Sequence, residues 1–353
     1  MRSPQEDAPP RSTSPRGPGR LEERYRTVLR LLPAGYRARW EEEMVAAFLE
    51  SMERDDPEEA EFLRDYGRPS WSEVGSVAAL AVRLRLGGAG TPRSLAWGAA
   101  VRLAVLMALL AQAAGGAVGA GLRLWLAGVL SWLPDPPGVW AAPTPSGFWH
   151  VAADLSGVVW LAAYLAFLFG HRSAGRAFIG LGMVSLAATA VVSTVDAAPL
   201  AVSPWAALLL DGVLLLATAA FRPDDLPVRT RAWLWALPVG GAVLAALLIA
   251  GSVASALLDW AGLQAVLVVA AALAYLGGAA LRLARPTPAW TLALLVLTVT
   301  ALALRLLTLV DYALIDGQAA WVVAGAAQAA ALLAVGAPLA FLTARSLPRS
   351  VPT

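Results

Sequence analysis

Residues 289–310 read AWTLALLVLTVTALALRLLTLV, and Arg305 is the only charged side chain among them. About 20 helical residues cross a hydrocarbon core that is about 30 Å thick, so this stretch is long enough to span a bilayer. Seven other apolar stretches of similar length follow Gly90. They cover residues 96–119, 149–170, 177–196, 204–221, 232–255, 260–281 and 318–342. The sequence therefore predicts an all-α fold, a polytopic transmembrane helical bundle of about eight spans within residues 94–343.

The overall composition agrees with a membrane protein. Hydrophobic residues make up 58% of the 353 residues, charged residues make up 15%, and the mean hydropathy is +0.63. A water-soluble domain with this balance would lack the polar side chains to cover its surface. The chain has no cysteine and only two histidines. These counts exclude thiolate metal sites and cysteine nucleophiles, and we expect neither a metal nor a cofactor.

Arginines occupy alternate connectors between the predicted spans, and every Lys or Arg position of the chain is arginine. The arginine-containing connectors are 171–176, 222–231, 282–286 and 343–349. The connectors without arginine are 134–149, 196–204, 311–320 and the turn at Asp259. Because arginine is retained on the cytoplasmic side, this pattern predicts a multi-pass protein of the cell membrane with both termini in the cytoplasm. The arginines serve topology and contact membrane lipid, so the net charge of +2 does not indicate nucleic-acid binding.

The region 94–133 is apolar for longer than one span requires, and Arg123 interrupts it. Two arrangements remain open. The region holds either one span followed by a helix along the outer interface, or two spans, which would invert everything that follows. The alternation of arginine argues against the inversion.

The N-terminal stretch 24–52, RYRTVLRLLPAGYRARWEEEMVAAFLESM, is amphipathic rather than apolar. Hydrophobic residues recur at helical spacing before and after Pro33, which predicts a helical hairpin. The predicted core of this hairpin consists of Tyr25, Leu29, Tyr36, Trp40, Met44 and Phe48. The acidic residues 41–43 are expected to face water.

Two further helices are predicted before the membrane. Asp56 and Pro57 begin a short acidic helix that stops at Gly67, and Ser70 with Glu73 forms a capping box for the next one. The predicted domains are a disordered cytoplasmic tail at 1–20, a cytoplasmic helical domain at 21–88, the transmembrane bundle at 94–343 and a cytoplasmic tail at 344–353.

The hairpin and the segment YGRPSWSEVGSVAALAVRLRLGG, residues 66–88, resemble the permease-prefix and HAAS-like helical modules of actinobacterial integral membrane proteins. The resemblance rests on Arg30, Leu31, Leu32, Pro33, Tyr36, Arg37, Trp40, Glu42, Glu43 and Met44, and it covers roughly the first quarter of the chain. It implies an N-terminal domain that works beside membrane signalling proteins, PadR-like regulators or ABC-type permeases. Modules of this kind are shared among unrelated membrane proteins, so the resemblance does not specify an activity.

Polar residues inside the predicted spans are the candidate functional groups, because burying them in a membrane is costly. Asp154, Asp211 and Arg305 lie roughly 7 to 11 Å below the outer ends of their helices at a rise of about 1.5 Å per residue. Gln264 lies in the same outer third. Asp154, Asp211, Gln264 and Arg305 are therefore a candidate intramembrane polar cluster. They form either an outward-opening polar pocket, or a structural Asp–Arg pair with side chains that reach for the interface.

The sequence leaves two functions open. One is a non-enzymatic sensor, regulatory or scaffold protein whose cytoplasmic domain contacts a partner such as a PadR-like regulator. The other is a permease or transporter component that works with an ABC ATPase and has a polar path in the outer half of the bundle. An intramembrane enzyme is disfavoured, because the sequence shows no metal motif and no Ser–His pairing at a shared depth.

Overall fold

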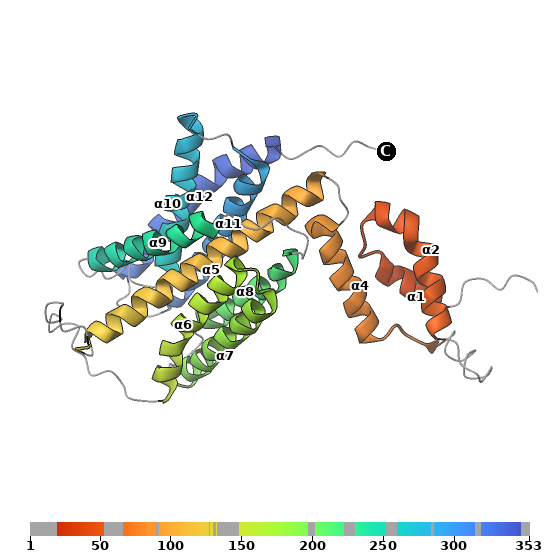
Figure 1. The fold of residues 1–353 in the computed structure, drawn as a ribbon, viewed down its shortest axis with the longest axis horizontal. Helices are drawn as coiled ribbons and strands as arrows, with labels where there is room; N and C mark the ends of the chain where they lie inside the picture. Colours follow the sequence, from red (N-terminus) through yellow and green to blue (C-terminus); the bar gives the residue numbers. More distant parts are fainter. Residues whose placement is uncertain are drawn as a thin grey trace, which may run out of the picture. The chain divides into compact units, whose positions relative to one another are not determined.

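The computed structural model describes residues 20–52, 66–88, 92–126, 128–129, 132, 148–196, 202–221, 230–251, 260–283, 286–314 and 319–346. Every regular element in these ranges is helical. The chain divides into two compact units, Met1–Gly90 and Thr91–Thr353. Figure 1 shows both units, and each is described by itself below.

The first unit contains α1 (Arg20–Leu29), α2 (Ala34–Ser51), α4 (Trp71–Arg83) and a π-helical turn, η1 (Leu84–Gly88). The three α-helices, the turn between α1 and α2, and η1 supply one buried core. Its members are Leu21, Tyr25, Leu29, Leu32, Val45, Phe48, Val77, Ala81 and Leu84. The rings of Tyr25 and Phe48 stack with their centroids 4.0 Å apart, which joins α1 to α2. The predicted helical domain therefore has its own hydrophobic core.

The start of α4 confirms the capping box. The hydroxyl of Ser70 accepts a hydrogen bond from the backbone N–H of Glu73, and the Glu73 carboxylate accepts one from the N–H of Ser70. Two backbone donors that the helix leaves without internal partners are thereby satisfied. The short acidic helix predicted to begin at Asp56 lies almost entirely outside the described residues.

The assignment of Trp40 to the core was wrong. Its side chain is 37% exposed and lies beside Arg39, whose guanidinium carbon is 5.3 Å from the ring centroid. The predicted stripe repeated every four residues, whereas a helix turns once in 3.6, so each step moves about 40° around the axis. Phe48 and Val45 face the core, whereas Trp40 lies about 80° from Phe48 around the helix axis and is exposed. Tyr36 and Met44 of the predicted stripe are partly buried and pack against the core.

The second unit consists of eight long helices in the described residues, and each apolar stretch predicted as a span coincides with one of them. They are α5 (Pro92–Leu126), α6 (Phe148–Leu168), α7 (Arg172–Asp196), α8 (Val202–Ala217), α9 (Thr230–Gly251), α10 (Trp260–Ala280), α11 (Pro288–Ala313) and α12 (Ala319–Ser346). A 3-10 turn, η3 (Thr218–Ala220), extends α8. Five helices, α5, α9, α10, α11 and α12, are long and apolar enough to cross a membrane. α6 and α8 contain shorter apolar stretches.

Helix α5 bears on the choice between one span with an interfacial helix and two spans in residues 94–133. It runs without a break for 35 residues, so residues 122–126 continue the helix rather than starting a separate interfacial one. Gly128 follows with a φ of 72°. Its N–H bonds to the carbonyl of Trp125, and the N–H of Val129 bonds to that of Leu124, which is the Schellman ending of a helix.

Helices α5 and α11 form the centre of the second unit. α5 packs against α6, α8, α9 and α11, and α11 packs also against α8, α10 and α12. Figure 1 shows α5 passing between the α6–α7 pair and the α10–α12 group. One buried cluster joins α5, α6 and α7 through Leu109, Tyr164 and Ile179.

The outer surface of the second unit is apolar as well. Large side chains that point away from the bundle include Val184, Leu209, Leu216, Val239, Val323 and Leu333. A surface of this kind is unfavourable in water and suits a hydrocarbon environment, where lipid tails cover it. Together with the five long apolar helices, it identifies the chain as a helical membrane protein.

Candidate functional site

A pocket of about 900 Å³ lies inside the second unit. Seven helices, α5 to α11, contribute to its wall, and α5 contributes the most residues. Most of the wall is alanine, glycine, leucine and valine. A large apolar cavity with a few polar groups is the usual form of a site for a small organic ligand, and 900 Å³ lies within the range of such sites.

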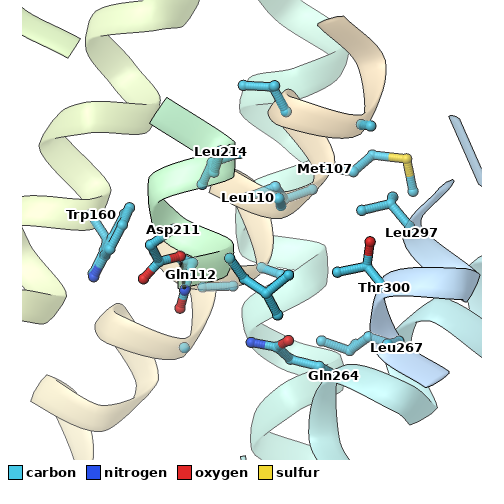
Figure 2. Close-up of a pocket in the computed structure, with 18 of the residues that line it drawn as sticks. Met107, Leu110, Gln112, Trp160, Asp211, Leu214, Gln264, Leu267, Leu297 and Thr300 are labelled. Carbon is cyan, nitrogen blue, oxygen red and sulfur yellow. Dashed lines mark hydrogen bonds between the residues drawn. The ribbon is translucent and has the colours of Figure 1, made fainter. Parts of the chain in front are cut away.

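Five polar side chains of the described lining residues interrupt the apolar wall. They are Gln112, Ser185, Asp211, Gln264 and Thr300. Figure 2 shows Gln112 and Asp211 on one side of the pocket, with Gln264 and Thr300 on the other. A ligand in this cavity therefore meets hydrogen-bonding groups at two opposite walls and hydrocarbon elsewhere.

Asp211 is the acidic group of this wall. It lies on α8 with only 7% of its surface exposed, and its Oδ1 accepts a hydrogen bond of 3.5 Å from Nε2 of Gln112 on α5. A distance of 3.5 Å is long for such a bond, which makes it weak. Because α5 packs against α8, the two side chains meet between neighbouring helices.

Small and aromatic residues shape the rest of the wall. Gly116 of α5 and Gly157 of α6 lie backbone to backbone. Trp97 and Trp160 contribute indole rings to the lining. The glycines let the helices approach closely on one side, and the many alanines and glycines of the lining take up little of the interior.

The structure brings together two of the four residues predicted as a polar cluster. Asp211 and Gln264 line the same pocket, and Arg305 is not among its lining residues. Asp154 belongs to α6, but its side chain lies outside the described residues. Asp211 and Arg305, whose side chains are both described, do not form an ion pair with each other.

Arg305 lies instead in the last third of α11 and packs against the first turns of α12. Its side chain is fully buried, and Nη1 donates a hydrogen bond of 3.3 Å to the hydroxyl of Thr308. The guanidinium carbon is 5.9 Å from the centroid of the Tyr312 ring. Gly325 of α12 makes space for it, because a Cβ at that position would come within 3.0 Å of Nη2.

Sequence reasoning missed Gln112. This residue lies within the predicted span 96–119, and a glutamine in an apolar span is the same kind of signal that singled out Gln264. The depth of Gln112 in its span does not by itself mark it as a site residue. What marks it is the hydrogen bond to Asp211 on another helix.

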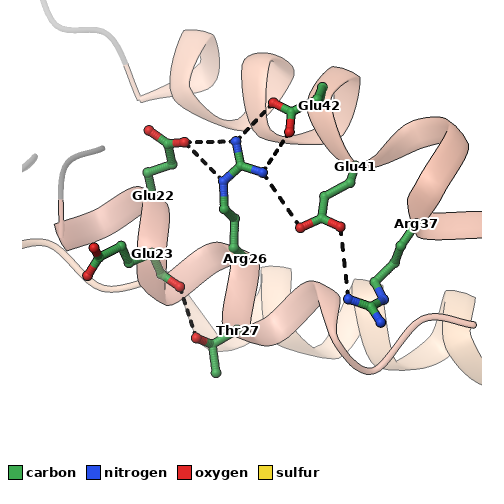
Figure 3. Close-up of polar contacts among 7 residues, drawn as sticks. All are labelled: Glu22, Glu23, Arg26, Thr27, Arg37, Glu41 and Glu42. Atoms are coloured by element: carbon green, nitrogen blue, oxygen red, sulfur yellow. Dashed lines mark hydrogen bonds and ion pairs between the residues drawn. The ribbon is translucent and has the colours of Figure 1, made fainter. Parts of the chain in front are cut away.

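The polar surface of the first unit is organised around Arg26 (Figure 3). Its guanidinium forms two bonds to the Glu42 carboxylate, at 2.8 and 2.9 Å, and two contacts to Oε1 of Glu22, at 3.0 Å from Nε and 2.9 Å from Nη2. Glu41 lies 3.6 Å from Arg26 and 3.9 Å from Arg37. Of the acidic residues expected to face water, Glu42 and Glu43 are exposed, and Glu41 and Glu42 also tie α2 to α1.

These contacts change the acidity of both partners. Hydrogen bonding to Arg26 lowers the pKa of Glu42 below its ordinary value. The same pairing, with Glu22 as the second acceptor, raises the pKa of Arg26. The charged forms are therefore the ones that the contact stabilises.

Comparison of the chain with models of protein families, with curated proteins and with solved structures gave no match.

Proposed function

We propose that this protein is a membrane sensor or regulatory protein. Its transmembrane bundle binds a largely apolar ligand in the pocket that helices α5 to α11 line. Its N-terminal helical unit contacts a partner protein in the cytoplasm. Binding, rather than catalysis, is the proposed activity.

The pocket is the observation that carries the ligand-binding part of this proposal. Its volume of about 900 Å³ accommodates a small organic molecule, and its wall combines hydrocarbon with polar groups on two sides. A molecule that dissolves in the membrane gains little by entering a purely apolar cavity. The polar groups Asp211, Gln112 and Gln264 supply the specific part of the binding energy.

Two neighbouring alanines of α10 provide a matched test of the pocket. Ala271 lines it, whereas Ala270 is exposed and points away. The full-length protein in lipid nanodiscs is labelled with dodecanol that carries a photoreactive diazirine, and the modified residues are mapped by mass spectrometry. We expect Ala271→Phe to abolish labelling of pocket residues and Ala270→Phe to leave it unchanged. Equal labelling in both variants and the wild type contradicts a ligand site in the pocket.

A transport role is the second candidate. Its support is that Asp211 and Gln264, which the sequence places at one depth, line the same cavity and offer a polar solute several hydrogen bonds on its way. Reconstituted vesicles distinguish the two roles. A sensor binds the labelled compound without moving it across the vesicle membrane, whereas a permease with its ATPase moves it in the presence of ATP.

The proposed topology has eight spans with both termini in the cytoplasm. It is supported by the eight helices of the second unit and by arginines in alternate connectors. Reporter fusions after Ser173 and after Thr353 should report a cytoplasmic location, and a fusion after Pro143 an external one. A cytoplasmic signal at Pro143 contradicts this topology.

The proposed partner contact is supported by the separate core of the first unit and by its resemblance to permease-prefix and HAAS-like modules. Trp71, the first residue of α4, is 89% exposed and offers an apolar contact. A photo-crosslinking amino acid at position 71 of the full-length protein identifies what binds there in the cell. A PadR-like regulator supports signalling, an ABC ATPase supports transport, and the absence of any protein adduct contradicts a partner at this surface.

A further inference from the structure

We propose that the pocket selects a cationic amphiphile, an apolar molecule with a protonated amine that pairs with Asp211. This assignment names the ligand class of the same pocket and therefore rests on the proposed ligand-binding function. It follows from the charges, the hydrogen-bonding groups and the aromatic rings of the described lining residues.

Among the described lining residues, the charge is of one sign. Asp211 is its acidic residue, and the described lining contains no arginine, lysine or histidine. An ionised carboxylate that is withdrawn from water is strongly destabilised unless a cation or several donors compensate it. Gln112 supplies one donor, at 3.5 Å, so a ligand cation would provide most of the compensation for the charge of Asp211.

Arg305, the buried cation of α11, does not supply this compensation within the pocket. Its guanidinium lies by Thr308 and Tyr312 and against the position of Gly325 on α12, a helix that does not line the cavity. The charge facing the cavity is therefore that of the aspartate.

The hydrogen-bonding groups fit an ammonium head. A carboxylate accepts several hydrogen bonds, and the amide of Gln112 carries an oxygen acceptor beside its donor nitrogen. An ammonium group has three donors and no acceptor, so it can bond to Asp211 and to the Gln112 oxygen together. A ligand carboxylate would meet a like charge and is disfavoured.

The remaining wall fits the rest of such a molecule. Trp160, with only 7% of its surface exposed, lies on the same side of the pocket as Asp211 and Gln112 (Figure 2). The face of an indole ring attracts a cation, most strongly where water is excluded. Beyond these residues the lining is aliphatic, as with Leu267 and Leu297, and suits a hydrocarbon chain.

Three compounds with one dodecyl chain and one diazirine, differing only in the head group, test the assignment. Dodecylammonium, dodecanol and dodecanoate are titrated onto the full-length protein in nanodiscs of an uncharged glycolipid, so that membrane surface charge neither concentrates the cation nor repels the anion. We expect dodecylammonium to label the pocket at concentrations at least about tenfold lower than dodecanol, and dodecanoate to label it least. This order is measured on the wild type, so it remains decisive if a variant fails to fold.

Asp211→Asn is the matched variant, because it keeps the shape of the side chain and removes its charge. The advantage of dodecylammonium over dodecanol should disappear in Asp211→Asn. It should persist in Asp311→Asn, which removes an acid of α11 that does not line the pocket. Equal labelling by all three compounds, or an advantage that survives Asp211→Asn, overturns the cationic ligand and leaves the ligand-binding function intact. If no compound labels the pocket, both proposals are overturned.

An amine can reach the pocket as the head group of a membrane lipid or as a separate small molecule. Nanodiscs that contain phosphatidylethanolamine distinguish these sources in a competition with labelled dodecylammonium. Reduced labelling assigns the amine to the lipid, and unchanged labelling assigns it to a separate amphiphile. Both results support a cationic ligand.

Discussion

Gly116 of α5 and Gly157 of α6 touch through their main chains, because a Cβ added at Gly157 would lie 2.7 Å from the Cα of Gly116. Real Cβ atoms do not approach another heavy atom so closely, so the two helices cross at a point where neither carries a side chain. Both residues also line the pocket. The close crossing therefore sets the position of the cavity wall that α5 and α6 form.

Gly157→Ala should lower the stability of the bundle by about 1 to 3 kcal/mol, because the new methyl group forces the helices apart. Gly121→Ala on α5 is the control, since nothing lies within 4 Å of the Cβ it would add. That substitution should be neutral or stabilising by up to about 1 kcal/mol through helix propensity. Thermal unfolding in detergent measures both. Equal melting temperatures for the two variants would contradict the close crossing.

Phe48→Ala should destabilise the first unit far more than Trp40→Ala. Phe48 is 5% exposed and stacks on Tyr25, so its truncation should cost about 3 to 5 kcal/mol. Trp40 lies at the surface, and its loss should stay within about 1 kcal/mol. Hydrogen exchange of residues 20–52 in the full-length protein reports both effects. A larger loss of protection in Trp40→Ala than in Phe48→Ala would mean that Trp40 belongs to the core.

Acidification should loosen the contact between α1 and α2 through Glu42. Its pKa is lower in the folded protein than in the unfolded chain, because Arg26 donates hydrogen bonds to it. The resulting stabilisation is present above the unfolded pKa of about 4.3 and is lost as the pH falls through the folded pKa.

Glu42→Gln should therefore remove this part of the acid sensitivity and lower stability slightly at neutral pH. Glu43→Gln, one position along on the exposed face of α2, is the control. Hydrogen exchange of α1 and α2 between pH 3 and pH 7 provides the measurement. An unchanged pH profile in Glu42→Gln would show that the pair does not contribute to stability.

Arg282→Gly should stabilise the end of α10. Arg282 has a φ of 56°, a left-handed conformation that costs a residue with a side chain about 1 kcal/mol. The N–H of Leu283 bonds to the carbonyl of Gly278 and that of Arg282 to Ala279, so the position requires this conformation.

Gly170, with a φ of 83°, occupies the equivalent position after α6 and provides the opposite test. Gly170→Ala should destabilise by a similar amount, although nothing lies within 4 Å of the added Cβ. The melting temperature should rise for Arg282→Gly and fall for Gly170→Ala. A lower melting temperature in both variants would mean that contacts of the Arg282 side chain stabilise the fold by more than its left-handed backbone conformation destabilises it.

The positions of the long helices could be predicted because the length of an apolar run and the thickness of a bilayer are both simple quantities. The stretch 289–310 and α11 agree to within a few residues at each end. The capping box at Ser70 was equally predictable, since its spacing is local.

Which side chains meet could not be predicted in the same way. Counting residues places a group along the helix axis, but the rotation of each helix about its axis decides what it faces. Asp211 and Arg305 share a depth in the sequence, yet Asp211 faces the pocket and Arg305 faces α12. The core assignment of Trp40 was wrong for the same reason, because a repeat of four residues differs slightly from the 3.6 residues of a helical turn and the difference accumulates into a large rotation about the helix axis.

Helix α5 is about 52 Å long at 1.5 Å per residue, whereas the hydrocarbon core measures about 30 Å. Even at a tilt of about 40°, the upper end of the usual range, it spans about 40 Å along the membrane normal. We therefore expect the inclination of α5 to respond to bilayer thickness, and a change of inclination moves the two ends of the helix the furthest. Only residues 89–91 separate its first residue from η1, so any change of inclination displaces the point at which the first unit is tethered.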